Sequence, residues 1–226
     1  YKVIFSIKIF MHKTIQNLND IKDKITQHNQ SYSNINIIAV SKTFPIERIA
    51  PLLNYGHKDF GENKVQEAIE KWSEIKSNDN SIKLHLIGKL QTNKVKYALK
   101  IFDYIHSLES KKLAKKIAEE QLKLSKKIKI FIQVNIGSEE QKSGVSVEEL
   151  EDLYKYSISL NLDIIGLMCI PPEDKNPDDY FKKLNSLNNS LGLNELSMGM
   201  SSDYISAINN NATYLRIGSE IFGKRD

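Results

Sequence analysis

Short apolar, β-branched runs alternate with longer amphipathic runs along almost the whole sequence. In the longer runs apolar residues recur every three or four positions, which is the periodicity of a helix with one buried face. No tight-turn signal joins one short run to the next, so β-hairpins are not expected. The predicted strands are residues 35–41, 57–60, 83–88, 102–107, 128–136, 162–168, 194–198 and 213–217.

This order of elements predicts an α/β protein. Eight strands that alternate with helices favour a parallel sheet closed as a (β/α)8 TIM barrel, with one extra helix before the first strand. A doubly wound open sheet is the alternative, but no glycine-rich dinucleotide fingerprint follows the first strand. The length of 226 residues suits one barrel, so we expect a single domain over residues 12–226 after an N-terminal extension, residues 1–11, of unclear status.

The same periodicity predicts which helix faces are buried. In the first helix the buried face comprises Ile15, Leu18, Ile21 and Ile25. In the helix predicted over residues 110–124 it comprises Leu113, Ala114, Ile117, Ala118 and Leu122. A further helix is expected over residues 146–157, where Ser146 and Glu149 match a capping box at its start.

Composition narrows the class of protein. The net charge is +4, but the lysines are interspersed with acids and form no basic stripe, so nucleic-acid binding is not expected. No run approaches the roughly 18 apolar residues of a membrane span. Cys169 is the single cysteine, which excludes an intrachain disulfide, favours the reducing cytoplasm and predicts a small buried side chain. Residues 1–10 are apolar, but no small-residue cleavage site follows, so no signal peptide is expected.

One lysine occupies a position suited to covalent chemistry. The apolar run over residues 35–45 delivers Ser41 and Lys42 at its end and is closed by Phe44 and Pro45. Desolvation at the end of an apolar strand disfavours the cationic form of an amine and makes it a better nucleophile. Lys42 is therefore a candidate to form an imine with a carbonyl ligand. The alternative is a solvated surface lysine, since Lys and Arg together number 32.

Further polar residues follow other predicted strands, at the barrel face where such enzymes place their sites. Segments 197–208 and 216–223 each put glycine and then serine at the start of a predicted helix. Free N–H groups at such helix starts favour phosphate, although a plain N-cap serine is the alternative. An imine lysine opposite a phosphate cup predicts pyridoxal 5'-phosphate (PLP) as the ligand. The residues at these strand ends are Gly61, Glu62, Asn63, Gln91, Asn93, Asn135, Met168, Met200, Ser201, Arg216, Gly218 and Ser219.

Histidines give no comparable signal. His85 and His106 lie within or at the end of predicted strands and are expected to be hydrogen-bonded packing residues, not acids or bases. No spaced set of His, Cys and carboxylate side chains indicates a metal site.

Eight segments in order resemble one known family, the pyridoxal phosphate homeostasis proteins, from about residue 35 to the C-terminus. These segments are AVSKTFP (39–45), YGHKDFGENKVQEA (55–68), HLIGKLQTNK (85–94), IHSLES (105–110), IQVNIGSEEQKSG (132–144), GLMCIP (166–171), LSMGMSSD (196–203) and LRIGSEIFGKR (215–225).

The resemblance implies a barrel like the N-terminal domain of alanine racemase, fold type III, with PLP held as an internal aldimine on Lys42. It implies that Arg216 faces the pyridine nitrogen. It also implies a phosphate site made by Ser201, Gly218 and Ser219. Asn63 and Met200, beside them at strand ends, complete the predicted cofactor-binding set.

Three functions remain open at this point. The first is a protein that stores PLP or hands it to PLP-requiring apoenzymes, acting as a monomer without significant turnover and with no catalytic residue. The second is a fold type III amino-acid racemase, which needs a second acid/base opposite the lysine. In alanine racemase a tyrosine from a separate domain supplies it, whereas this sequence stops at Asp226, just after the last barrel signature. The third is a barrel that binds another phosphorylated metabolite, with Lys42 as a plain cation. We expect the first.

Overall fold

The structure is a computed structural model that describes residues 11–28, 35–139 and 141–224. Its strands form a closed barrel in the order β1 to β8, and each strand pairs in parallel with its neighbours. The strands are β1 Asn36–Val40, β2 Asp59–Glu62, β3 Lys83–Leu86, β4 Tyr104–Leu108, β5 Lys129–Gln133, β6 Asp163–Met168, β7 Glu195–Ser197 and β8 Tyr214–Ile217. The predicted TIM barrel is confirmed. The expectations for residues 1–10 fall outside the described residues.

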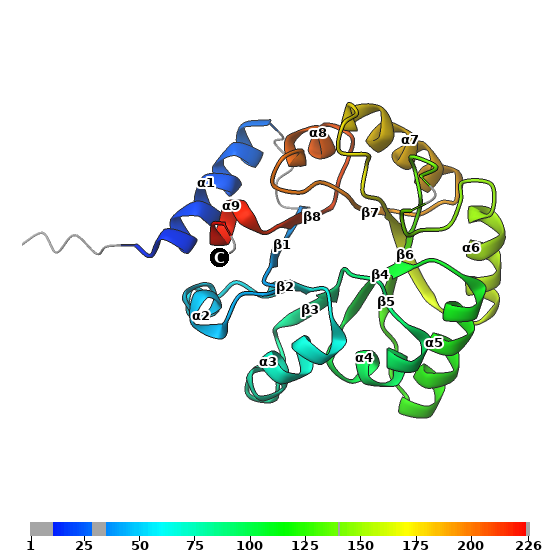
Figure 1. Cartoon of the computed structure of the whole chain (residues 1–226), viewed down its shortest axis with the longest axis horizontal. Coiled ribbons are helices and arrows are strands. Elements are labelled where there is room, and N and C mark those ends of the chain that lie inside the picture. The colour runs from blue at the N-terminus through cyan, green and yellow to red at the C-terminus, as the bar shows by residue number, and fades with distance from the viewer. Residues whose placement is uncertain (1–10, 29–34, 140, 225–226) are drawn as a thin grey trace, which may run out of the picture.

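Helices form a ring outside the strands (Figure 1). They are α1 Lys13–His28, α2 Ile46–Asn54, α3 Val65–Asn78, α4 Val95–Ile101, α5 Lys111–Leu124, α6 Leu150–Ser159, α7 Pro177–Ser190, α8 Tyr204–Asn209 and α9 Ser219–Phe222, with a 3-10 turn at Thr92–Lys94. The extra helix α1 packs against α8 and α9, so the start of the described chain lies beside its end. Of the predicted face of α1, Leu18, Ile21 and Ile25 are fully buried and Ile15 is partly buried.

The period-two alternation of the strands separates two cores. Residues such as Ile37 and Ala39 point outward into the core between strands and helices. Ile38 and Val40 point into the barrel, where they pack with Phe131, Met168 and Tyr214. The interior of the barrel is thus filled with side chains.

Three local predictions are wrong. β2 begins at Asp59 because the His57 N–H bonds to the Leu52 carbonyl and closes the turn after α2. Ser146 Oγ does accept the Glu149 N–H at 3.2 Å, but this bond closes a turn, and α6 begins at Leu150. Leu122 is 83% exposed. Gln121 takes the buried place on α5, where its side-chain oxygen accepts the Ile128 N–H at 2.9 Å.

In the described parts of the chain, we find no helix with the length and apolar character needed to cross a membrane.

Candidate cofactor site

The residues predicted to bind the cofactor line one cavity of about 300 Å³ at the C-terminal end of the barrel. They come from the segments that follow β1, β2 and β7 and from β8 with the turn after it. Val40, Ile87 and Ile170 add apolar walls, and Ser202 adds a further hydroxyl. The set brought together comprises Lys42, Asn63, Met200, Ser201, Arg216, Gly218 and Ser219.

Lys42 is partly buried in a tight turn directly after β1. The Ser41 N–H continues the ladder by bonding to the Gly61 carbonyl at 2.9 Å, and Thr43 then reverses the chain with a left-handed φ of 67°. Left-handed backbone is unfavourable for a β-branched residue such as threonine, so surrounding contacts must hold it there. The turn is thus fixed on both sides of Lys42.

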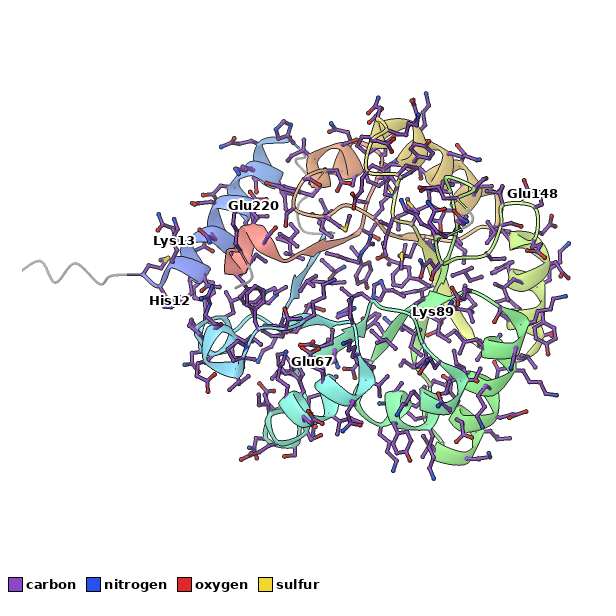
Figure 2. The ribbon with its side chains drawn as sticks, in the orientation of Figure 1. His12, Lys13, Glu67, Lys89, Glu148 and Glu220 are labelled. Carbon is purple, nitrogen blue, oxygen red and sulfur yellow. The ribbon has the colours of Figure 1, made fainter. Side chains whose placement is uncertain are left out.

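Those contacts come from a charged clamp, which we define as Glu62, Glu67 and Lys71. The Lys71 ammonium donates to the Ser41 carbonyl at 2.9 Å and to both carboxylates at 3.0 Å. Glu67, labelled in Figure 2, accepts the Thr43 N–H at 2.6 Å. The backbone on either side of Lys42 is therefore held by ionic hydrogen bonds, which are stronger than neutral ones.

Glu62 is the buried end of the clamp. Its Oε1 accepts from the Ser41 hydroxyl at 2.7 Å and the Trp72 ring N–H at 3.0 Å. Burial raises the pKa of Glu62, while these donors and Lys71 oppose the shift. The donors therefore stabilise the charged form of this buried carboxylate.

Arg216 lies at the inner end of the cavity and is 4% exposed. Its guanidinium donates to the Ser197 hydroxyl at 2.8 Å and to the Cys169 carbonyl at 2.9 Å. A guanidinium has five donors and no acceptor, so further N–H groups remain for a ligand. Cys169 is fully buried, and burial raises the pKa of its thiol to about 12, so the predicted small buried side chain is confirmed.

Two loops bring the serines to the cavity mouth. Gly199 has a φ of +90°, and a Cβ there would lie 2.7 Å from the Ala207 Cβ, so only glycine fits. Beyond it the Met200 N–H bonds to the Asp203 carboxylate at 2.6 Å. Ser201 Oγ accepts the Glu220 N–H at 3.3 Å and so ties this loop to the start of α9. Ser201 precedes α8, which begins at Tyr204, whereas Ser219 is the first residue of α9.

Asn63 owes its position to a glycine. A Cβ on Gly88 would lie 2.4 Å from the Asn63 carbonyl oxygen and 2.9 Å from its Cα. The loops after β2 and β3 therefore touch through their backbones, and this contact brings Asn63 to the cavity edge.

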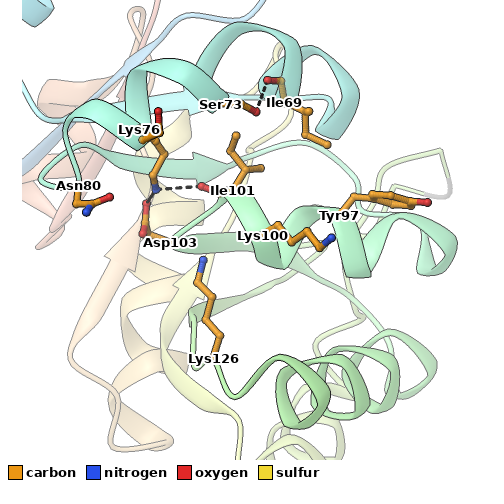
Figure 3. Close-up of a pocket in the computed structure, with 10 residues that line it drawn as sticks. Ile69, Ser73, Lys76, Asn80, Tyr97, Lys100, Ile101, Asp103 and Lys126 are labelled. Atoms are coloured by element: carbon orange, nitrogen blue, oxygen red, sulfur yellow. Dashed lines mark hydrogen bonds and ion pairs between the residues drawn. The ribbon is translucent and has the colours of Figure 1, made fainter.

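A second cavity, of about 710 Å³, lies between α3 and α4 at the N-terminal ends of the strands (Figure 3). It contains Lys76, Lys100 and Lys126 near Asp103. Lys76 is paired with Asp103 and donates to the Ile101 carbonyl, so this ammonium is already engaged. Ligands of barrel proteins bind at the other end, where the predicted residues converge. We therefore assign the smaller cavity as the candidate cofactor site.

Comparison with known proteins identifies the family. A family model for the N-terminal domain of alanine racemase matches residues 16–226. The pyridoxal phosphate homeostasis protein of Aquifex aeolicus (strain VF5) is 43% identical over 199 residues, which cover 84% of this chain and 86% of that protein. Its counterpart in Escherichia coli (strain K12) is 32% identical over 230 residues, covering 96% and 98%. The chain belongs to the pyridoxal phosphate homeostasis protein family.

Solved structures agree. PipY of Synechococcus elongatus PCC7942, determined without PLP, superimposes with a TM-score of 0.85 at 31% identity, covering 94% of this chain and 100% of PipY. PipY with PLP bound gives 0.83 at 31% identity, covering 93% and 100%. Alanine racemase of Clostridium difficile 630 gives 0.72 at 16% identity, covering 94% of this chain and 57% of the racemase. That last likeness shows a shared fold alone.

Sequence reasoning missed the residues that support the site. Ser197, Glu67 and Lys71 are not among the predicted site residues, because their roles depend on contacts between distant segments. A signal existed for Glu67 and Lys71, which have the i, i+4 spacing of a helical ion pair. His85 and His106 are fully buried and hydrogen-bonded, as predicted. In the described ranges, no group of three or more His, Cys, Asp or Glu side chains is placed to hold a metal ion.

Proposed function

We propose that this chain binds PLP covalently, as an imine on Lys42, and stores or transfers it without significant catalytic turnover. The observation that carries the proposal is the meeting of Lys42, Arg216 and the serine loops in one cavity. The solved structure of PipY with PLP bound supports it, because PipY is 31% identical and covers 93% of this chain.

The chemistry of the cavity fits each part of this cofactor. Ser201, Ser219 and the backbone of Gly218 offer hydroxyl and N–H donors suited to a phosphate dianion. Val40, Ile87 and Ile170 offer apolar surface to an aromatic ring, and Lys42 offers the amine. When bound, the cofactor would supply an aldehyde carbon to that amine and an electron-withdrawing ring.

Arg216 supports a role without turnover. Since a guanidinium only donates, a ring nitrogen facing it must be the acceptor and stay unprotonated, which weakens the ring as an electron sink. Two-base racemisation also needs a second acid/base. Among the described residues that line the cavity, Lys42 and Arg216 are the only ionisable side chains. Lack of a positioned acid/base typically costs about 100-fold to 10,000-fold in rate.

Membership of the family supports further proposals about domain organisation, compartment and partners. The relatives from Aquifex aeolicus and Escherichia coli are named pyridoxal phosphate homeostasis proteins. We propose that residues 12–226 act as one domain and one monomer in the cytoplasm. PLP-requiring apoenzymes are the partners that this role implies.

Cofactor titration tests the binding part of the proposal. Adding PLP to the wild-type protein is expected to produce a visible absorption band that Lys42→Ala abolishes. Ser201→Ala and Arg216→Ala should each weaken PLP binding by roughly 1–3 kcal/mol, the range for hydrogen bonds to charged groups. Lys155→Ala, in which an exposed lysine of α6 is replaced, is the matched control and should behave as wild type. A Lys42→Ala protein that keeps the band would refute the assignment, and phosphate-dependent binding without any band would favour the third function.

A chiral assay tests the absence of turnover. Holoprotein is incubated with alanine, serine and other amino acids, and in parallel with a PLP-requiring apoenzyme. We expect transfer of the cofactor to the apoenzyme and at most residual racemisation. Racemisation at about 1 per second or faster, the ordinary range for enzymes, would establish a racemase instead.

A further inference from the structure

A polar chain runs through the interior of the barrel and ends on Arg216. It starts at Asp59, the first residue of β2, and continues through His85, His106 and Ser197. Asp59 Oδ1 lies 3.0 Å from His85 Nε2, and His85 Nδ1 lies 3.0 Å from His106 Nε2. His106 Nδ1 lies 2.8 Å from the Ser197 hydroxyl, which accepts from Arg216 at 2.8 Å. The polar chain thus joins the N-terminal end of the barrel to the candidate cofactor site.

The polar chain is shielded from water everywhere except at Asp59, where it starts. The side chains of His85, His106 and Ser197 are fully buried, whereas that of Asp59 is 28% exposed. The His85 ring stacks on Tyr104 with centroids 4.2 Å apart, and the His106 ring stacks on Phe131 at 4.4 Å. These stacks fix the ring planes, so the ring nitrogens keep pointing along the chain. A buried polar network of this kind is costly unless every member is paired.

The donors and acceptors can be matched in one direction only. Because Arg216 can only donate, the Ser197 oxygen accepts from it and the Ser197 proton goes to His106 Nδ1. His106 must then carry its own proton on Nε2 and donate it to His85 Nδ1. His85 in turn carries its proton on Nε2 and donates to the Asp59 carboxylate. The opposite order would leave the Ser197 proton without an acceptor in the polar chain, and it would require either a proton on Asp59 or a second proton on His85.

We propose that Asp59, His85, His106 and Ser197 are positioning residues that hold the Arg216 guanidinium toward the cofactor ring. Two neutral histidines, both in the Nε2–H form, connect the buried cation at one end to a carboxylate at the other. The role in cofactor binding rests on the proposed function, whereas the order of the protons does not.

Nuclear magnetic resonance of the PLP-free protein tests the proton order. Long-range ¹H–¹⁵N spectra of the full chain with ¹⁵N-labelled histidine are expected to show His85 and His106 as neutral Nε2–H rings at neutral pH. A scalar coupling across the hydrogen bond should join His85 Nδ1 to His106 Nε2. Signals are assigned by their loss in His85→Gln and His106→Gln proteins. A charged His106, or an Nδ1–H form of either ring, would overturn the proposed order.

Cofactor titration of two variants tests the positioning role. Ser197→Ala removes the hydroxyl that links His106 to Arg216, and we expect the dissociation constant for PLP to rise at least about tenfold. Ser157→Ala is the matched control: this serine of α6 is fully buried and donates to the Leu153 carbonyl at 2.7 Å, and it is not a member of the polar chain. Its PLP affinity should equal that of wild type.

The second variant, Asp59→Asn, changes the end of the polar chain that is farthest from Arg216. Asp59→Asn removes the terminal charge and should raise the dissociation constant several-fold, although it lies at the opposite end of the barrel. Asp163→Asn is its matched control, because Asp163 is likewise the first residue of its strand, β6, and is exposed. Wild-type affinity in both Ser197→Ala and Asp59→Asn would overturn the positioning role. If wild type itself bound no PLP, the proposed function would fail, while the proton order would still be decided by the PLP-free spectra.

Discussion

Acid is expected to destabilise the folded protein, because buried and partly buried histidines are held neutral. Burial lowers the pKa of His57 from 6.5 to about 4, although Asp59 opposes the shift. Burial lowers the pKa of His106 well below 6.5, and His85 and Arg216 add to this effect. The pKa of His85 is also lowered by burial, against the opposing influence of Asp59. All three shifts have the same sign.

The sign and size of the effect follow from proton linkage. A histidine whose pKa is lowered by folding binds more protons in the unfolded chain, so the free energy of unfolding falls as pH drops below about 7. Between about pH 7 and pH 5.5, each histidine that stays neutral when folded costs about 1.3 kcal/mol. His57 and His106 together account for about 2.5 kcal/mol. That is a large share of a typical stability of about 5–15 kcal/mol.

Urea denaturation of the PLP-free protein at the two pH values measures this loss. We expect wild type to lose about 2.5 kcal/mol, and His57→Gln to lose about 1.3 kcal/mol less than wild type. His28→Gln is the matched control, since His28 is exposed at the end of α1, and it should keep the wild-type dependence. Equal stability of wild type at both pH values, or an unchanged pH dependence in His57→Gln, would refute the reasoning.

Two further substitutions test how the site is built. Lys71→Met removes the cation that opposes the raised pKa of the buried Glu62 and should lower stability by roughly 3 kcal/mol at neutral pH. The loss should be smaller in acid, because protonation of Glu62 removes the charge left without its partner. Urea denaturation beside the exposed-lysine control Lys155→Met checks this, and equal losses in the two proteins would argue against the clamp. Gly88→Ala places a Cβ 2.4 Å from the Asn63 carbonyl oxygen, so the loop that carries Asn63 must move and PLP should bind more weakly. Wild-type PLP affinity in the Gly88→Ala protein would show that this backbone contact is not needed.

The barrel could be predicted because most of its strands have a clear local sequence pattern. A run such as residues 37–40 is apolar on both faces, as a strand buried between a filled barrel and a ring of helices must be. β2 was misplaced because two of its four residues are acidic, and one of them, Glu62, is buried through partners from other segments. The capping-box pattern at Ser146 forms one of its two hydrogen bonds, from the Glu149 N–H to Ser146 Oγ, and closes a turn before α6 begins at Leu150. Local chemistry alone does not decide at which residue the helix begins.

The residues that line the candidate site could also be predicted from the sequence. Lys42 and Arg216 stand at strand ends, and the barrel's geometry alone brings strand ends together. The polar chain behind Arg216 was not predictable. In the sequence, nothing distinguishes His85 and His106 from other residues of alternating strands. Their contacts with Asp59 and Ser197 depend on the register of strands β2, β3, β4 and β7.

Borohydride reduction tests the central claim, a covalent link between PLP and Lys42, most directly. Holoprotein is reduced, digested and analysed by mass spectrometry for peptides that carry the reduced cofactor. The account predicts that the label lies on the peptide containing Lys42, and that the visible band disappears as the label forms. Label found wholly on another lysine, or no label on a protein saturated with PLP, would contradict the account.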